Sequence, residues 1–148
     1  MRVIVASDHA GQRRREAIRA HLATGGHEVV SIGPKGSDSA DYPDFAIPAA
    51  ERVAAGEFDR GVLICGTGMG MAIAANKVPG IRAATPYDEF TAEVSRKHND
   101  TNVVCFGERS MDTDRTLGLL DIWMATGFEG GRHARRVEKI AEAEKRRG

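Results

Sequence analysis

Runs of apolar residues recur along the chain, and each is followed by a polar or glycine-containing segment. Three of these runs, at 3–6, 62–65 and 103–106, are four consecutive apolar residues rich in Val and Ile. Continuous apolar character, without alternation, is typical of strands buried on both faces of a parallel sheet. With two shorter runs added, the pattern predicts strands at 2–7, 28–32, 60–65, 81–85 and 103–107.

Between these runs the apolar residues recur at helical spacing. Ile18 and Leu22, for example, lie four residues apart among arginines, and Gly25 follows that segment. The spacing predicts helices at 12–24, 43–55, 71–75, 88–97, 112–126 and 133–147. Strands that alternate with helices indicate a three-layer α/β/α domain with a five-stranded, parallel, Rossmann-like sheet. The whole of 1–148 is expected to form one domain.

Composition narrows the functional classes. Lys plus Arg and Asp plus Glu are both 21, so no net field favours nucleic acid or a membrane surface. No apolar run approaches the roughly 20 residues that span a bilayer, and the first residues have no signal-peptide pattern. The two cysteines lie in apolar runs, which indicates a reducing cytoplasm and no disulfide framework. No Cys or His pair has metal-ligand spacing, so we expect no metal site.

The segment 62–76 is the centre of the predicted site. A buried strand leads into Gly66, Gly68 and Gly70, and a run of good helix formers follows. Free N–H groups and the dipole at such a helix start favour negative charge. No Lys-Ser or Lys-Thr pair follows, as a P-loop requires, and Met71 replaces the third glycine of a dinucleotide fingerprint. The pattern therefore predicts a small anionic ligand or intermediate beside Cys65.

Other polar residues follow the predicted strands directly. The carboxyl ends of parallel strands meet at one edge of the sheet, so Asp8 and His9, Cys65 and Thr67, and Arg109 should converge there. Each also has a purely structural interpretation. An Asp at this position can cap a helix, and a free cysteine is commonly a small buried hydrophobe. The helix start instead favours the Cys65 thiolate, a competent base. Cys105, surrounded by Val and Phe, is expected to be structural.

Two further groups are candidates for binding. His98 and Asn99 end a predicted helix, where a histidine can also simply interact with the helix dipole. Arg132 and Arg136 lie four apart, so they project from one face of the last helix. Such a face is usually solvated, but guanidinium groups are also the best side chains for binding phosphate.

With these residues assembled, the sequence resembles the B-type ribose-5-phosphate isomerases. Their family of sugar-phosphate isomerases also includes galactose-6-phosphate and allose-6-phosphate isomerases. The matching segments run in order along nearly the whole chain: Ser7-Asp8-His9-Ala10-Gly11, 41–43, Cys65-Gly66-Thr67-Gly68 with Gly70, 73–77, 80–83, His98-Asn99-Asp100-Thr101-Asn102, 107–109 and 130–136.

The resemblance implies a metal-free and cofactor-free aldose–ketose isomerase that interconverts ribose 5-phosphate and ribulose 5-phosphate through an enediolate. It places the chain in the pentose phosphate pathway and in the branch that uses cysteine as base. It also implies a homodimer or a tetramer with shared active sites, and helix 133–147 at the dimer interface. The implied catalytic residues are Cys65, His98, Thr67 and Asp8, and the implied binding residues are Asp8, His9, Gly66, Gly68, Met69, Gly70, Asn99, Arg109, Arg132 and Arg136.

Two alternatives remain open from the sequence. The substrate could be allose 6-phosphate, galactose 6-phosphate or a tetrose phosphate, because loop lengths set the size of the pocket. The chain could also be a non-catalytic sugar-phosphate sensor. Cys65 and His98 weigh against a sensor, since a binding module needs no base.

Overall fold

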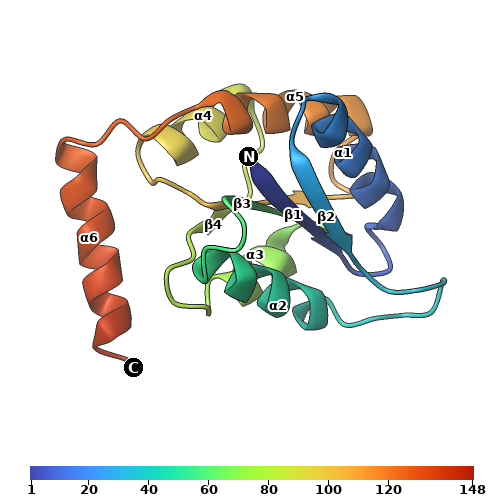
Figure 1. Cartoon of the computed structure of the whole chain (residues 1–148), viewed down its shortest axis with the longest axis horizontal. Helices are drawn as coiled ribbons and strands as arrows, with labels where there is room; N and C mark the ends of the chain where they lie inside the picture. The colour runs from blue at the N-terminus through green and yellow to red at the C-terminus, as the bar shows by residue number, and fades with distance from the viewer.

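The computed structural model describes residues 1–148, which fold into a five-stranded parallel sheet between two layers of helices (Figure 1). The strand order is β2-β1-β3-β5-β4, which confirms the predicted three-layer α/β/α architecture. The strands are β1 (Arg2–Ser7), β2 (Glu28–Ile32), β3 (Arg60–Cys65), β4 (Ala83–Ala84) and β5 (Val103–Gly107). The helices are α1 (Gln12–Thr24), α2 (Pro43–Ala54), α3 (Met69–Ala75), α4 (Glu89–Lys97), α5 (Thr113–Ala125) and α6 (Arg132–Lys145).

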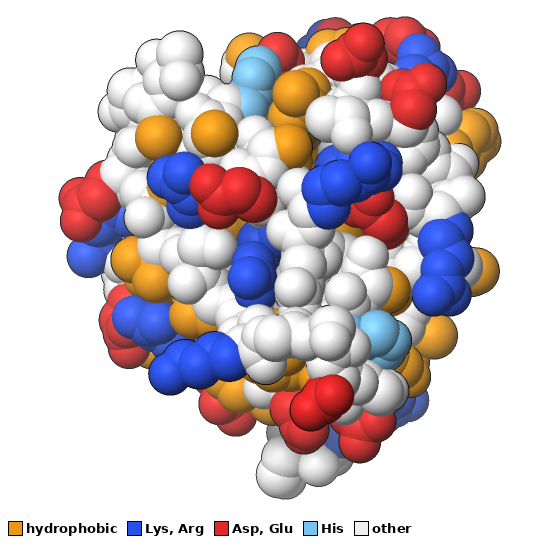
Figure 2. Space-filling model, turned by 90° about the vertical axis from the view of Figure 1, so that its right-hand side faces the viewer, with side chains coloured by type: hydrophobic (Ala, Val, Ile, Leu, Met, Phe, Trp, Pro, Cys, Tyr) orange, Lys and Arg blue, Asp and Glu red, His pale blue; other side chains and the backbone are white.

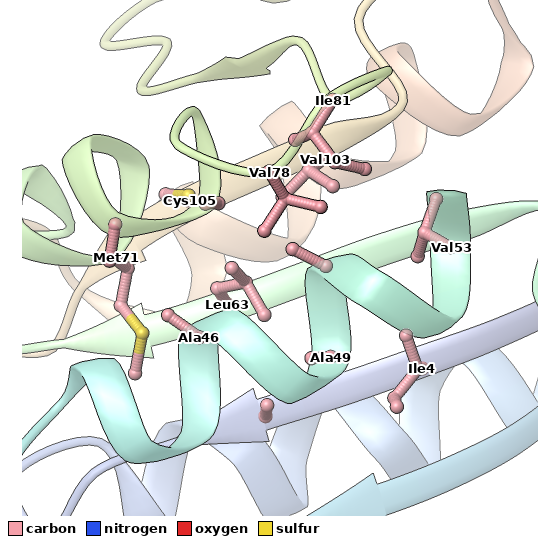
Figure 3. Packing of buried hydrophobic residues seen from close by; sticks show 14 of the residues in the cluster. Ile4, Ala46, Ala49, Val53, Leu63, Met71, Val78, Ile81, Val103 and Cys105 are labelled. Carbon is pink, nitrogen blue, oxygen red and sulfur yellow. The ribbon is translucent and has the colours of Figure 1, made fainter. Parts of the chain in front are cut away.

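Each face of the sheet has its own apolar core. On one face, α2 and α3 pack on the sheet through Leu63, Met71 and Val103 (Figure 3). Three buried alanines of α2, Ala46, Ala49 and Ala50, present only methyl groups to this core. On the other face, α1, α4 and α5 enclose a second cluster around Phe106 and Trp123. The central strands are therefore buried on both sides, as their uninterrupted apolar runs predict.

Strand β4 is shorter than the predicted 81–85 and covers only Ala83 and Ala84. It lies at the edge of the sheet, where Asn76 takes the place of a further strand. The Asn76 side chain accepts from the N–H of Ala83 at 2.8 Å and donates to its carbonyl at 3.0 Å. A side chain that covers the edge in this way protects it from pairing with another chain.

Helix α6 stands apart from the other helices (Figure 1). Its only buried residue is His133 at its start, and near its end Glu144 accepts from the N–H of Gly80 at 3.1 Å. A cavity of about 460 Å³ separates the helix from the sheet between these contacts. The helix is therefore held to its own chain mainly at its two ends. None of the helices is long and apolar enough to cross a membrane.

Candidate active site

The loops that follow β1, β3 and β5 come together at the carboxyl edge of the sheet, as predicted. The N–H of Asp8 donates to the Ile64 carbonyl at 3.3 Å, and the N–H of Arg109 donates to the Gly66 carbonyl at 2.9 Å. The loops touch backbone to backbone. A Cβ on Gly11 would lie 2.8 Å from the Ile64 carbonyl oxygen, and a Cβ on Gly107 would lie 2.7 Å from Thr67 Cα.

Cys65 is the last residue of β3 and is 5% exposed. Its Sγ accepts a hydrogen bond from the N–H of Gly68 at 3.2 Å. That bond requires the tight turn at Gly68, whose φ is 79°, and a Cβ there would approach the Phe106 backbone to 3.0 Å. Only glycine meets both conditions. The bond fixes the sulfur at the start of the glycine loop, where a proton-abstracting base could act.

The glycine loop still has free donors. The N–H of Gly68 donates to Cys65 Sγ, and the N–H of Met69 donates to Thr67 Oγ1 at 3.3 Å. The N–H groups of Gly66, Thr67 and Gly70 have no acceptor within the chain. They lie beside the thiol and can stabilise a developing oxyanion. The Thr67 hydroxyl accepts one bond and keeps its own proton for donation.

Asp8 and His9 each use one side-chain atom for hydrogen bonds within the chain. Asp8 Oδ1 accepts from the N–H groups of Ala10 and Gly11 at 3.0 and 3.2 Å. These bonds hold the turn that precedes α1, whose N-cap is Gly11 without a side-chain cap, so the helix-capping interpretation is wrong. The other carboxylate oxygen of Asp8 has no partner and can bind a ligand hydroxyl. His9 Nδ1 accepts from the N–H of Ala40 at 3.0 Å, and its Nε2 has no partner in the chain.

Two further side chains lie over the glycine loop. The exposed Arg109 guanidinium lies 3.3 Å from the position a Gly66 Cβ would occupy, and it forms no ion pair. The Tyr42 ring lies 2.8 Å from the corresponding position at Gly70. Tyr42 was not predicted as a site residue, although its segment 41–43 belongs to the motifs. It comes from another part of the chain, and only the fold brings it to this loop.

Basic and acidic side chains lie interspersed on the face of the molecule seen in Figure 2. No field of a single sign covers this surface, in agreement with a formal net charge of zero. Attraction for an anionic ligand must therefore come from individual arginines and N–H groups rather than from a broad potential.

The remaining predicted residues lie at the opposite edge of the sheet. His98 is the C-terminal cap of α4, just before β5 begins, and the N–H of Gly61 at the start of β3 donates to Asn102. Cys65 lies four positions after Gly61, which is on the order of 13 Å along a strand. One chain therefore does not bring His98 and Cys65 together.

His98 is stacked on His133, the one buried side chain of α6. The ring centroids are 4.1 Å apart and the ring planes differ by 9°. Burial, followed by the nearby His98 and the charge of Arg132, lowers the pKa of His133 below its usual value. A neutral His133 can therefore pack against His98 at neutral pH. This contact joins the ends of α4 and α6, and the N–H of Glu129 reinforces it by donating to the Lys97 carbonyl at 3.0 Å.

The same contact brings together three possible metal ligands that the sequence spacing did not predict. Ligand atoms of His98, Glu129 and His133 lie within 4.8 Å of one another, and these three residue types are metal ligands. The two rings are nearly parallel, however, so their in-plane lone pairs point side by side instead of at one centre. One ring would have to rotate before both could bind the same ion.

Arg132 and Arg136 lie on the first turns of α6, exposed and without ion pairs. Gly130 and Gly131, with φ of 71° and 58°, precede the helix.

The second cysteine, Cys105, is 1% exposed, and burial raises the pKa of its thiol, which keeps it protonated. Cys105 is thus a core residue, as expected.

Comparison with known proteins gives consistent results. The family model described as Ribose/Galactose Isomerase matches residues 3–140. Ribose-5-phosphate isomerase B of Escherichia coli is 46% identical over 95% of this chain and 94% of its own length. D-erythrulose-4-phosphate isomerase 2 of Mycolicibacterium smegmatis is 40% identical over 87% of both chains. A crystal structure of ribose-5-phosphate isomerase B from Mycoplasma genitalium with bound ribulose-5-phosphate has a TM-score of 0.94, with 42% identity and coverage of 97% and 96%.

Proposed function

This chain belongs to the ribose/galactose isomerase family, and we propose that it interconverts ribose 5-phosphate and ribulose 5-phosphate. The observation that carries the proposal is the Cys65 thiol, held by a backbone N–H beside three free N–H donors. That arrangement supplies a base and an oxyanion site within one loop. The relative that holds ribulose-5-phosphate supports the choice of substrate.

The reaction moves a carbonyl group by one carbon. The Cys65 thiolate takes the proton from C2 of the open-chain aldose, and the electron pair of that C–H bond forms the C1–C2 double bond of an enediolate. The N–H groups of Gly66 and Gly70 stabilise the charged oxygen, a contribution worth about 3–4 kcal/mol for a well-placed donor. The thiol then returns the proton to C1, while the hydroxyl proton moves from O2 to O1. Asp8 and Thr67 bind the hydroxyl groups.

Ring opening and phosphate binding require the second group of residues. His98 donates a proton to the ring oxygen as the C1–O4 bond breaks, and the C1 hydroxyl releases its proton to solvent water as it becomes the carbonyl. Arg132 and Arg136 bind the phosphate together with His9 and Arg109. Asn99 contributes its free side-chain amide. His98 and Asn99 lie at the amino edge, far from their own Cys65, and α6 extends from the body of the chain. The partner subunit of a homodimer therefore supplies this group to the site.

Exposed apolar side chains support an assembly with shared sites. Ile140 on α6 is 48% exposed, and four other large apolar side chains are more exposed still: Met69, Ile73, Tyr87 and Phe90. Met69 and Ile73 belong to α3, which begins at the glycine loop, so a partner that covers them would also reach Cys65. A dimer is the smallest assembly that completes the site, with α6 at its interface.

Mixing of variant subunits tests this proposal. A Cys65→Ala chain and an Arg136→Ala chain are each expected to be impaired at substrate concentrations below KM. After subunit exchange, one of the two sites in the heterodimer has both residues intact. An equal mixture should regain about a quarter of the wild-type activity, since half of the dimers are mixed. Native mass spectrometry verifies the exchange, and complete exchange without recovered activity would place the arginines in their own subunit's site.

A four-carbon substrate is the second candidate, because a relative with 40% identity is named as an erythrulose-phosphate isomerase. Coupled assays with four-, five- and six-carbon aldose phosphates distinguish these possibilities by kcat/KM. We expect the five-carbon sugar to have the highest value. A higher value for the four-carbon sugar would reassign the substrate but leave the chemistry of Cys65 unchanged.

A further inference from the structure

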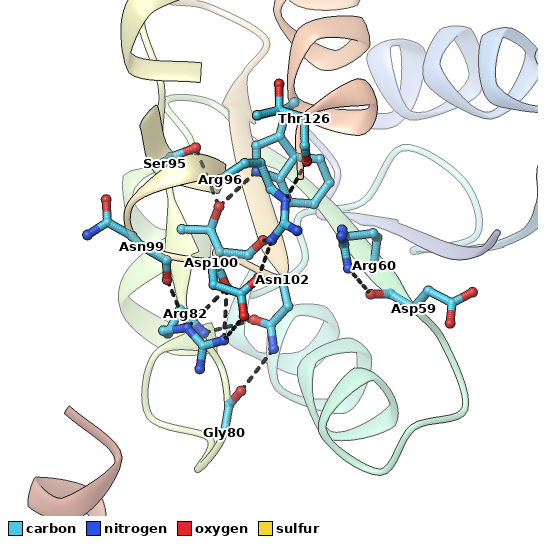
Figure 4. Close-up of polar contacts among 12 residues, drawn as sticks. Asp59, Arg60, Gly80, Arg82, Ser95, Arg96, Asn99, Asp100, Asn102 and Thr126 are labelled. Carbon is cyan, nitrogen blue, oxygen red and sulfur yellow. Dashed lines mark hydrogen bonds and ion pairs between the residues drawn. The ribbon is translucent and has the colours of Figure 1, made fainter. Parts of the chain in front are cut away.

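Side-chain hydrogen bonds from Arg82 and Arg96 hold the turn that follows α4 (Figure 4). It carries His98 and Asn99 and ends at Asn102, just before β5. Asp100, with φ of 47°, is the only non-glycine residue in the left-handed region. This conformation is strained for most residues but tolerated by Asp and Asn. It reverses the chain directly after His98 and Asn99, so the surroundings must hold it in place.

Arg82, from the segment before β4, holds this turn from one side. Its Nε donates to the carbonyls of Asn99 and Asp100, each at 3.0 Å, and its Nη2 donates to the Asp100 carbonyl at 2.9 Å and to Asp100 Oδ2 at 3.1 Å. One planar guanidinium thus joins two successive carbonyls and a carboxylate. A lysine, with one nitrogen, does not reproduce this pattern.

Arg96 holds the turn from the inside. This residue of α4 is 3% exposed, and its Nη1 donates to Asp100 Oδ1 at 2.8 Å and to the Thr101 carbonyl at 2.6 Å. The Asp100 carboxylate therefore joins a buried arginine to a partly exposed one. Arg82 and Asn99 also line the cavity beneath α6, together with Ile140 and Glu144 from the second half of that helix, so the outer side of the network faces α6.

We propose that Arg82 and Asp100 are positioning residues that fix the turn 98–102, so that the His98 imidazole and the Asn99 amide are presented together to the substrate. This inference rests on the proposed function. His98 is the C-terminal cap of α4. The last turn of a helix frays unless its free backbone carbonyls find hydrogen-bond partners. Arg82 binds Asn99 only at its backbone carbonyl. The exposed side-chain amide of Asn99 has no partner in the chain and is therefore available to the substrate.

The rates of two reactions, compared in the same variant, distinguish a misplaced His98 from a general loss of structure. Isomerisation of ribose 5-phosphate begins with a cyclic sugar and needs the ring opened. Exchange of the C1 hydrogen of ribulose 5-phosphate with solvent deuterium needs only proton removal, because this ketose has its O5 phosphorylated and cannot close a five-membered ring. NMR follows the exchange, and a coupled assay follows the isomerisation.

Arg82→Gln should lower kcat for ribose 5-phosphate by about 10-fold or more, since a misplacement of ~1 Å can cost about 10²-fold. Deuterium exchange should fall by less than about 3-fold, because the base and its donors lie at the other edge of the sheet. Asp100→Asn, which tolerates the same backbone conformation, should show the same selectivity. Arg52→Gln is the matched control, because it breaks an ion pair with Glu57 of 2.9 Å away from both halves of the site.

The outcomes distinguish this inference from the function on which it rests. His98→Asn is measured in parallel and should show the same selective loss. If His98→Asn is selective and Arg82→Gln and Asp100→Asn are not, the positioning role is wrong and the role of His98 stands. If His98→Asn lowers both reactions equally, its role in ring opening is wrong and the inference fails with it. Proportional losses of both reactions and of Tm in the two network variants would show a purely structural network.

Discussion

The two edges of the sheet carry the two groups of site residues, and they are built differently. At the carboxyl edge, backbone packs on backbone through Gly11, Gly68 and Gly107, where no Cβ has room. At the amino edge, the contacts are between side chains: a stacked histidine pair and the network around Asp100. At the glycines that precede α6, no atom lies within 4 Å of the position that a Cβ would occupy.

This difference corresponds to different chemical demands. Proton transfer and oxyanion stabilisation tolerate little displacement, and closely packed backbone provides that precision. Phosphate binding by long arginine side chains tolerates more, and in our proposal the helix that carries them must dock on a second subunit. A rigid loop therefore holds the base, while an extended helix holds the cations. The following predictions test this contrast, beginning with the largest effect.

Removal of the base at the rigid edge should have the largest effect. Cys65→Ala should lower kcat by on the order of 10²-fold or more, as expected for loss of a general base, with the fold intact by circular dichroism. Cys105→Ala is the control and should leave kcat within about 3-fold, because that thiol is buried and protonated. A sensitive Cys105 and a tolerant Cys65 would reverse the assignment.

At the amino edge, Arg136→Ala should mainly weaken substrate binding. KM for the sugar phosphate should rise by roughly 10- to 100-fold, corresponding to about 1.5–3 kcal/mol for a charge-assisted contact. Arg135→Ala is matched to it, since the neighbouring arginine is also exposed but points from a different face of α6. Equal changes in KM for the two variants would indicate a general charge effect rather than a phosphate contact.

Two glycines with similar backbone conformations compare the edges directly. Gly68 and Gly130 have φ of 79° and 71°, but only Gly68 has the Phe106 backbone at 3.0 Å from a Cβ position. Gly130→Ala should cost about 1–2 kcal/mol, the strain of the left-handed conformation alone. Gly68→Ala should cost more and should also lower activity. Urea denaturation measures both, and equal losses would mean that the carboxyl-edge loop adapts more readily than its packing indicates.

The smallest effect concerns the pH dependence of stability. The pKa of His133 is lowered in the folded chain by burial, so the unfolded chain takes up a proton first as the pH falls below about 6.5. The folded state should therefore lose stability from that pH downward. His133→Phe keeps an aromatic ring against His98 but cannot be protonated, and its Tm should decrease less between pH 7.5 and pH 5.5. An unchanged decrease would show that His133 is not the group responsible.

The sequence by itself determined the elements and the carboxyl-edge loop. Apolar periodicity placed all five strands, and most helix ends agree with the structure to within one or two residues, because both depend on local spacing. The loop after β3 was also predictable, since strand, glycines, thiol and helix start are consecutive in the chain. Strand β4 was predicted too long, because only Ala83 and Ala84 pair with β5. Its outer edge is bonded to the Asn76 side chain, which the periodicity does not reveal.

Only the tertiary structure decided the other contacts. The stacking of His98 on His133, the hold of Arg82 on the Asp100 turn and the place of Tyr42 over Gly70 join residues 18 to 35 positions apart. Such pairs depend on the order of the strands and on where each crossover helix ends, which a local period does not encode. The separation of His98 from Cys65 has the same origin. Helices run antiparallel to the strands, so the end of a helix and the end of a strand lie at opposite edges of the sheet.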